Sequence, residues 1–441
     1  MMLKRILLLF ILVSGHAQHS YGAESYESGK PLTLTKALAL TLEHSPELSA
    51  FSWDIRSAEA RIIQAKLIPN PEIGFEGENL NELSSRSGNE MQNTLRLSQL
   101  IELGGKRKLR VREAQFDRES TQWDYQVKRL EVLKQTTTAY IDVLAAQANV
   151  QLAEEGLAIA EAAVPVTEKR LEAGKASEVE MVRTNTAVAS ARIELEQTKR
   201  ELQTARLNLA AQWGEKEAVF PAVVGNLERV SKLPPLESLN AKLQGSPNLA
   251  RWTTEREKRQ ATLNLARAEV KPDLTFEAGP RVIASHPVDL TFVAGFSIPL
   301  PLWNRNEGRI AEAEANVGKV ADERAAAETR AYADLNEAYQ TLARAAEEVR
   351  VLRESVLPGA KSALGQITEG YSAGRFGQLD VLDAQRSYNE TRTQYVRALT
   401  AYHKAQAQID ALTALPVELP SPSEPLSKTY GNRNKKVSRN E

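Results

Sequence analysis

The sequence contains the same long pattern twice, at an offset of about two hundred residues. Residues 45–78 align with residues 246–279, where Pro46 matches Pro247 and Pro71 matches Pro272. Further along, AGKASEVEMVRTN (173–185) aligns with AGRFGQLDVLDAQ (373–385). Because the offset stays nearly constant, we predict that each half of the chain is one copy of a single structural unit.

Each unit is predicted to contain a helix, two strands and two long helices, in that order. In the first half, residues 35–67 are rich in helix-forming residues, and Pro69 and Pro71 end this helix. After the strands, residues 106–172 and 305–372 are poor in glycine and proline. A continuous helix over either stretch would be on the order of 100 Å long.

The helix that returns after each long helix carries a seam of apolar and small residues. The spacing between seam residues alternates between three and four, which is typical of coiled-coil packing. The seams are Val188, Ala191, Leu195, Thr198, Leu202, Ala205 and Leu209, and then Tyr388, Thr391, Tyr395, Ala398, Tyr402, Ala405 and Ile409. We interpret Gly174 and Gly374 as the turns that join each long helix to its antiparallel partner.

Four segments alternate between apolar and polar residues, as half-buried strands do. They are residues 71–80, 93–100, 273–278 and 289–298. The charged residues of the polar face are Glu72, Glu76, Glu78, Arg96, Asp273, Glu277 and Asp289. Polar loops are predicted at 81–90 and 279–289, and bends at Gly104–Gly105 and Pro299–Pro301.

This alternation fits either a soluble sheet or the lipid-facing and lumen-facing sides of a membrane barrel. The chain begins with Lys4, Arg5 and an apolar run over Ile6–Val13, which predicts a secretory signal peptide over 1–23, or cleavage after Ala17. A signal peptide implies that the protein is exported, which favours the membrane barrel over the soluble sheet. Four strands cannot close one, so two chains would supply eight strands and three chains twelve.

The predicted organisation is a signal peptide, two repeats, a linker between them and a tail. The repeats cover 24–213 and 246–413, and the segment 214–245 connects them. The Pro/Ser-rich and then basic tail, 414–441, is predicted to be disordered.

The composition excludes several classes of function. The net charge is −1 and no basic cluster contains interleaved aromatic residues, so we expect no nucleic-acid partner. The chain has no cysteine and five scattered histidines, so we expect no metal site and no cofactor. No P-loop and no nucleophilic cysteine is present, so we expect no enzymatic activity.

Four motifs carry a resemblance to a known family: LIPNPEIGFEGE (67–78), ELGGKR (102–107), PLPLWNRNEGRI (299–310) and the segment 373–410. Together with the duplicated plan, they resemble the TolC-like outer membrane efflux family over residues 32 to about 413. The first three are most similar to its heavy-metal, CzcC-like (cobalt–zinc–cadmium) branch. The resemblance implies a homotrimer in the outer membrane, with a shared twelve-stranded barrel in the lipid and an α-helical periplasmic tunnel. It also implies a periplasmic adaptor and an inner-membrane pump of the resistance–nodulation–division (RND) type as partners.

The resemblance further implies a constriction at the periplasmic tip of the tunnel. The matching gate positions are Asp380, Asp383, Glu180 and Tyr371; the family's basic residue has no aligned counterpart, because Arg375 lies one place early and Phe376 holds its position. The i, i+3 spacing of the two aspartates places them on one helix face, although an aspartate there also suits the helix N-terminus. We hypothesise that Arg183 pairs with an acid of the neighbouring hairpin.

Three further points remain open. An acidic barrel interior would suit cationic cargo, whereas the same residues would also serve as an ordinary solvated face. The alternative for the cargo is that the protein is an outer membrane channel for drug efflux or type I protein secretion. A soluble periplasmic coiled-coil adaptor or scaffold is the alternative of a different class, because it would use the same helical hairpins without a barrel.

Overall fold

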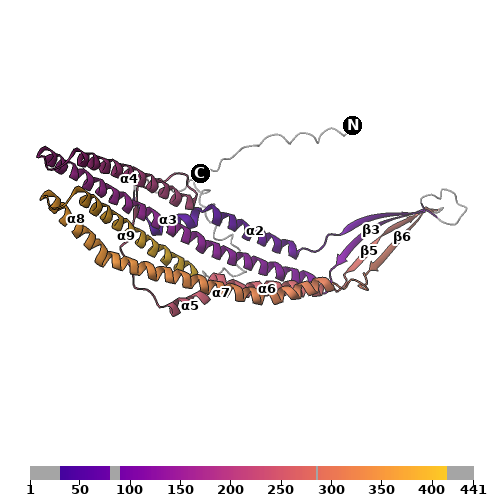
Figure 1. Cartoon of the computed structure of the whole chain (residues 1–441). Coiled ribbons are helices and arrows are strands. Elements are labelled where there is room, and N and C mark those ends of the chain that lie inside the picture. The colour runs from indigo at the N-terminus through magenta and orange to yellow at the C-terminus, as the bar shows by residue number, and fades with distance from the viewer. Residues whose placement is uncertain (1–29, 80–89, 285–286, 415–441) are drawn as a thin grey trace, which may run out of the picture.

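The computed structural model describes residues 30–79, 90–284 and 287–414. The signal peptide predicted over 1–23, most of the loop at 81–90 and nearly all of the tail lie outside these residues. The protein is a long helical body with one four-stranded sheet at its end (Figure 1). Both helical hairpins turn at the opposite end of the body.

The two halves repeat the same order of elements, as the sequence predicts. The first half contains α1 (Leu34–His44), α2 (Pro46–Lys66), β2 (Glu72–Glu78), β3 (Gln92–Ile101), α3 (Lys106–Glu172) and α4 (Glu178–Ala210). The second contains α5 (Leu236–Gln244), α6 (Pro247–Ala268), β5 (Leu274–Ile283), β6 (Asp289–Ser297), α7 (Glu307–Val351), α8 (Leu357–Ser372) and α9 (Gln378–Thr413). Two short strands, β1 (Leu32–Thr33) and β4 (Val223–Val224), pair in parallel.

The single helix predicted over 35–67 is two helices in the structure. Pro46 cannot continue α1 because it has no N–H, and it begins α2 instead. Pro247 has the same place at the start of α6. The segment 214–245 was predicted to be a connection, but it contains the helix α5. Because α5 directly precedes α6, as α1 precedes α2, it is the second-half counterpart of α1.

The predicted long helix of the first half is confirmed: α3 is 67 residues long and keeps Pro165 inside it. Its counterpart is not continuous. A π-helical segment, Leu352–Val356, separates α7 from α8 just before Pro358. A proline removes one backbone donor, and a local π turn is one way in which a helix absorbs such a change.

Each half has its own core beside the coiled-coil seams. One cluster joins α1, α3 and α4 and includes Tyr140, Leu209 and Phe220. The other joins α5, α7 and α9 and includes Leu335 and Ile409. All of the predicted seam residues are buried or half-buried, so the coiled-coil packing is confirmed.

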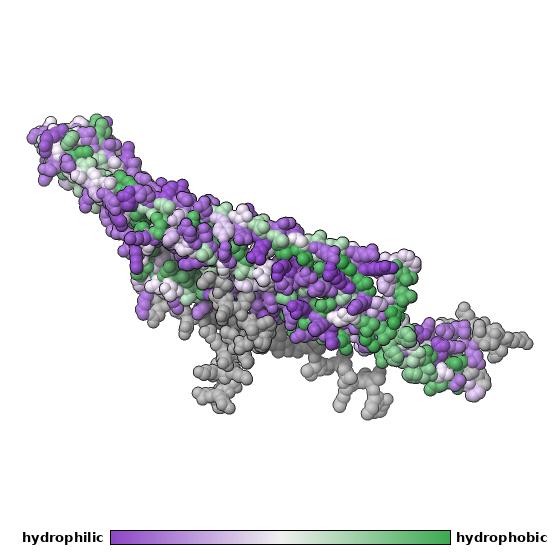
Figure 2. Space-filling view, turned by 90° about the horizontal axis from the view of Figure 1, so that it is seen from below, coloured by the Kyte–Doolittle hydropathy of each residue, from purple (hydrophilic) through white to green (hydrophobic). Residues whose placement is uncertain are grey.

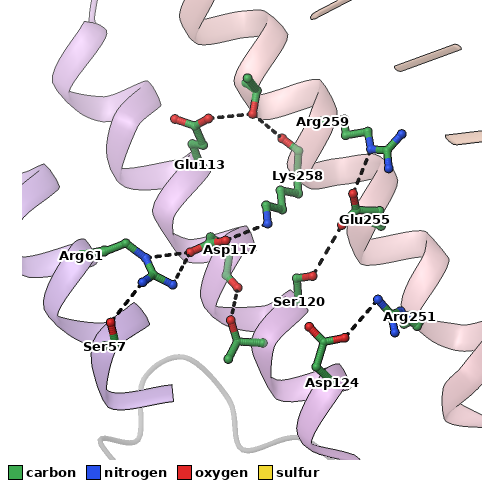
Figure 3. A network of polar contacts seen from close by, with 12 residues as sticks. Ser57, Arg61, Glu113, Asp117, Ser120, Asp124, Arg251, Glu255, Lys258 and Arg259 are labelled. Carbon is green, nitrogen blue, oxygen red and sulfur yellow. Dashed lines mark hydrogen bonds and ion pairs between the residues drawn. The ribbon is translucent and has the colours of Figure 1, made fainter. Parts of the chain in front are cut away.

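Polar contacts hold α2 and α6 on either side of α3 (Figure 3). The carboxylate of Asp117 on α3 accepts a hydrogen bond of 2.9 Å from Nε of Arg61 on α2 and lies 2.7 Å from Nζ of Lys258 on α6. Two turns further along, Arg251 of α6 lies 3.0 Å from Asp124 of α3. The helices α2, α3 and α6 are therefore joined by charged groups as well as by apolar packing.

The sheet has the order β2-β3-β5-β6, and all neighbouring strands are antiparallel. The loop predicted over 279–289 is wrong for its first five residues, because β5 continues through Pro280 to Ile283. Gly279 allows this, since β5 approaches β3 there too closely for a side chain. The bend at Gly104–Gly105 is confirmed, with φ values of 75° and 73°. Within the part of the chain described, no helix has the length and apolar content needed to cross a membrane.

Candidate functional site

The apolar face of the sheet is not covered by the helical body. Its side chains are largely exposed: Ile73 by 78 %, Phe75 by 72 % and Phe292 by 72 %. The other large apolar residues that are exposed there are Leu95, Leu97, Ile101, Phe276, Val282, Leu290 and Phe296. An exposed apolar patch of this kind marks a surface that meets lipid or another protein.

The polar face contains two arginines among the predicted acids. Arg96 forms a salt bridge with Glu76 and lies 3.6 Å from Glu277. Arg281 lies 3.8 Å from Glu78. Arg281 was missed as a member of this face because its position was predicted to be a loop. The face is therefore less acidic than the sequence suggests.

The three remaining acids predicted on this face are at its ends. Glu72 is the first residue of β2 and Asp289 the first of β6, and both are exposed. Asp273 lies just before β5, where its Oδ1 is 2.8 Å from Nζ of Lys106 and accepts a hydrogen bond of 2.9 Å from the N–H of Leu103. Its carboxylate thus holds the junction between the sheet and α3.

The second candidate site is the tip, where both hairpins turn at the end of the body away from the sheet (Figure 1). Gly174 and Gly374 have φ values of 68° and 79°, in the left-handed region that favours glycine. The N–H of Lys175 donates to the carbonyl of Arg170 at 2.8 Å, and the N–H of Arg375 donates to that of Gly370 at 2.7 Å. These glycines are therefore the turns, as predicted.

The acids that follow these turns cap the returning helices. Ser177 and Glu180 form a capping box, in which each side chain accepts a hydrogen bond from the other's N–H at 3.4 Å. On α9, Asp380 accepts a hydrogen bond of 2.8 Å from the N–H of Gly377. Asp383 is exposed and has no ion-pair partner among the described residues.

Within one chain, the two hairpins are tied together beside the tip. The hydroxyl of Tyr371 donates to Glu180 Oε2 at 3.2 Å, and Arg170 donates to the carbonyl of Tyr371 at 2.7 Å. The Arg170 guanidinium also lies 4.3 Å from the centre of the Tyr371 ring. Nε2 of Gln378 donates to the carbonyl of Glu180 at 2.5 Å and to the hydroxyl of Thr184 at 2.6 Å.

The sequence pointed to Tyr371 and Glu180 but missed Arg170, Gln378 and Thr184. No local pattern distinguishes these three from other polar residues near helix ends. The side chains of Arg183 and Arg375 are exposed, and neither has an ion-pair partner in the part of the chain described. The same part contains no group of three or more His, Cys, Asp or Glu side chains arranged to hold a metal ion.

The comparison with known families decides between a channel and a soluble scaffold. The family model described as "Outer membrane efflux protein" matches residues 37–215 and 239–415, once in each half. The chain belongs to the outer membrane efflux protein family. Its two matched segments cover most of the sequence and follow the repeat.

Two characterised efflux family relatives are resistance proteins. The chain is 33 % identical to the cobalt-zinc-cadmium resistance protein CzcC of Cupriavidus metallidurans, over 88 % of this chain and 91 % of that protein. It is 26 % identical to the nickel-cobalt-cadmium resistance protein NccC of Alcaligenes xylosoxydans xylosoxydans, over 66 % of this chain and 65 % of that protein.

Solved structures agree with the fold of this efflux protein. The crystal structure of CusC, studied for its folding and transmembrane channel formation, superposes with a TM-score of 0.72 at 18 % identity. The match covers 87 % of this chain and 92 % of CusC. At that identity the likeness concerns the fold.

Proposed function

We propose that this protein is the outer membrane channel of a tripartite efflux system that exports heavy-metal cations. The observation that carries the proposal is the 33 % identity to CzcC, which extends over 91 % of that protein. The exposed apolar face of the sheet supports a position in lipid, because the described helices leave it uncovered.

The channel is proposed to be a homotrimer with a shared barrel. β2 and β6 are the outer strands of the four-stranded sheet, so each has one edge without a partner strand among the described residues. Three copies joined at these edges make twelve strands, and closure removes the exposed edges. A periplasmic adaptor and an inner-membrane RND pump would complete the path from the cell.

The tip is proposed as the gate. Glu180 and Tyr371 hold the two hairpins of one chain together, whereas Asp383 has a carboxylate free to face the pore axis. Threefold symmetry would bring the Asp380 and Asp383 carboxylates together in a ring that favours cations over anions. Arg183 and Arg375 are exposed cations available to pair with acids of the next hairpin when the gate is closed.

Growth tests of a deletion strain decide the cargo. The strain is complemented with the gene and exposed to zinc, cobalt, cadmium, nickel and a panel of organic drugs. Metal sensitivity that the gene restores supports the proposal. Sensitivity restricted to organic compounds would assign an organic cargo, and recovery of the protein in the soluble periplasmic fraction would contradict a channel.

Conductance in planar bilayers tests the gate. The double variant Asp380→Asn and Asp383→Asn keeps an oxygen acceptor for Gly377 but removes both charges. We expect it to lower the cation-over-anion permeability ratio several-fold and to raise the conductance of the closed state. Asp322→Asn, on an exposed position of α7, is the matched control. Unchanged selectivity in the double variant would overturn the gate assignment.

A further inference from the structure

The chain crosses between the helical body and the sheet four times, all at one end of the sheet (Figure 1). β2 and β5 begin there, and β3 and β6 end there. Each crossing carries exposed basic residues close to the strand end. These residues are Lys66, Arg107, Lys108, Lys271 and Arg305.

None of these five side chains has an ion-pair partner within the described ranges. The acids nearest to them in the chain are already in use: Glu102 is bound by Arg110, and Asp273 by Lys106. Hydrogen bonding by Arg110 holds the pKa of Glu102 below its ordinary value, so this carboxylate stays charged and occupied. Glu269 is paired with Arg309, and Glu72 and Glu307 are the exposed acids at the crossings without an ion-pair partner among the described residues, which leaves an excess of positive charge.

Exposed apolar residues lie directly beside these cations. Trp303 is 91 % exposed and Leu300 is 71 % exposed, in the segment between β6 and Arg305. Leu67, Ile68, Leu103, Ile298 and Leu302 are also exposed. Figure 2 shows hydrophobic surface where the helical body narrows toward the sheet. A tryptophan among aliphatic and basic side chains is typical of the boundary between lipid and water.

We call these five basic residues, together with Leu67, Ile68, Leu103, Ile298, Leu300, Leu302 and Trp303, the junction collar. We propose that the junction collar binds anionic phospholipids of the periplasmic leaflet. The cations contact the headgroup phosphates, and the apolar side chains contact the upper acyl chains. The collar continues the exposed apolar face of the sheet, so one lipid layer can contact both.

The inference rests on the proposed function, because it requires the sheet to lie in a membrane. It adds a preference for anionic phospholipid and a depth at which the sheet lies in the bilayer. Phosphates bound at the four crossings would fix how far the sheet enters the bilayer, since the collar lies at the boundary between the two parts of the chain. A neutral phospholipid offers no net charge to the collar, so an anionic lipid is the better partner.

Lipid retention by the full-length protein tests the collar. The protein is reconstituted in vesicles of equal parts phosphatidylcholine and phosphatidylglycerol and re-extracted in mild detergent, and the retained lipids are quantified by mass spectrometry. We expect several-fold enrichment of phosphatidylglycerol on the wild-type protein. The triple variant Arg107→Gln, Lys108→Gln and Arg305→Gln should reduce the ratio toward one.

The matched control is Arg324→Gln, Arg330→Gln and Lys361→Gln, which removes the same charge from exposed positions of α7 and α8. It should keep the wild-type enrichment. Trp303→Ala should lower the amount of both lipids without changing their ratio. No enrichment on the wild-type protein, or an equal loss in the control variant, would overturn the proposal.

Metal resistance and outer membrane fractionation of the same strains distinguish a failure of the lipid-binding proposal from a failure of the proposed channel function. A wild-type protein that inserts and confers resistance, but shows no lipid preference, refutes only the collar. A protein that neither inserts nor confers resistance refutes both. Loss of the oligomer in the triple variant, without lipid preference in the wild type, would assign the collar to contact between copies.

Discussion

At the scale of the residue, Gly279 controls how closely β5 approaches β3. A Cβ at this position would lie 1.8 Å from the carbonyl oxygen of Leu95 and 3.1 Å from Cα of Arg96. No side chain fits there unless the strands separate. The close approach also brings Arg96 within reach of Glu277 on β5.

Gly279→Ala is therefore expected to destabilise the sheet by about 1–3 kcal/mol, the usual cost of forcing a group into a packed site. The measurement is the urea midpoint of the detergent-solubilised protein, with heat-modifiable bands on gels as a second readout. Gly74→Ala is the control, because Gly74 lies in β2 with nothing within 4 Å of a Cβ. Equal midpoints for the two variants would show that the close approach is unimportant.

At the scale of the element, the two returning helices begin with different caps. α4 has a reciprocal capping box between Ser177 and Glu180, whereas α9 has one hydrogen bond from Gly377 to Asp380. Glu180 also accepts from Tyr371, so the cap of α4 is connected to the contact between the hairpins. Loosening this cap should therefore loosen the tip.

Ser177→Ala removes one half of the box and should destabilise the first turn of α4 by about 1 kcal/mol. Amide hydrogen exchange of residues 178–182 should rise roughly fivefold, following the factor of ten per 1.4 kcal/mol. Ser190→Ala, at an exposed position further along α4, should leave this exchange unchanged. Wild-type protection in Ser177→Ala would show that the box adds nothing to the stability of the tip.

The contact of α3 with α2 and α6 depends on the charge of Asp117. Burial opposes ionisation, but the hydrogen bonds and charges of Lys258 and Arg61 outweigh it and hold the pKa of Asp117 below its ordinary value of 3.8. A lowered folded pKa means that the stabilisation is complete above the unfolded pKa and is lost as pH falls through the folded value. Neutral pH thus favours the network.

Asp117→Asn should lower the free energy of unfolding at pH 7 by roughly 1 kcal/mol, since the site is partly exposed and screened. Its stability should also fall less than that of the wild type when pH is lowered from about 5 to about 3. Thermal unfolding followed by circular dichroism across this range measures both effects. If the stability of the variant and of the wild type changed with pH in parallel, the charge of Asp117 would not contribute to the stability of this network.

At the scale of the whole molecule, the two ends have opposite surfaces. The sheet exposes large apolar side chains on one face, while the tip exposes charged and polar residues around Gly174 and Gly374. The long helices keep these ends apart. Such an arrangement suits a protein that is held by lipid at one end and meets soluble partners at the other.

Phe292→Glu should prevent stable insertion, because it removes the burial of a phenylalanine, about 1.5–3 kcal/mol, and adds a charge to the lipid-facing side. We expect the outer membrane fraction to contain several-fold less of this variant. Thr291→Glu is the control on the opposite face of the same strand, where the register places Arg281. Equal recovery of both variants would contradict lipid contact at Phe292.

Patterns along the chain determined the repeat, the ends of the long helices, the seams and the alternation of the strands. Helical and strand periods are properties of consecutive residues, so Gly174, Gly374 and the limits of α3 were predictable. The same reasoning misread Pro280 as a loop, because the close pairing of β5 with β3 overrides a local turn signal.

Only the tertiary structure decided which side chains meet. Lys106 binds Asp273, Arg170 contacts Tyr371, and Arg281 reaches Glu78 across the sheet. Each pair lies far apart in the sequence, and its partners are chosen by how strands and hairpins pack rather than by any local spacing. Local spacing likewise left open whether Asp380 caps the returning helix, and the folded chain gives it that hydrogen bond from Gly377 while both Asp380 and Asp383 stay exposed.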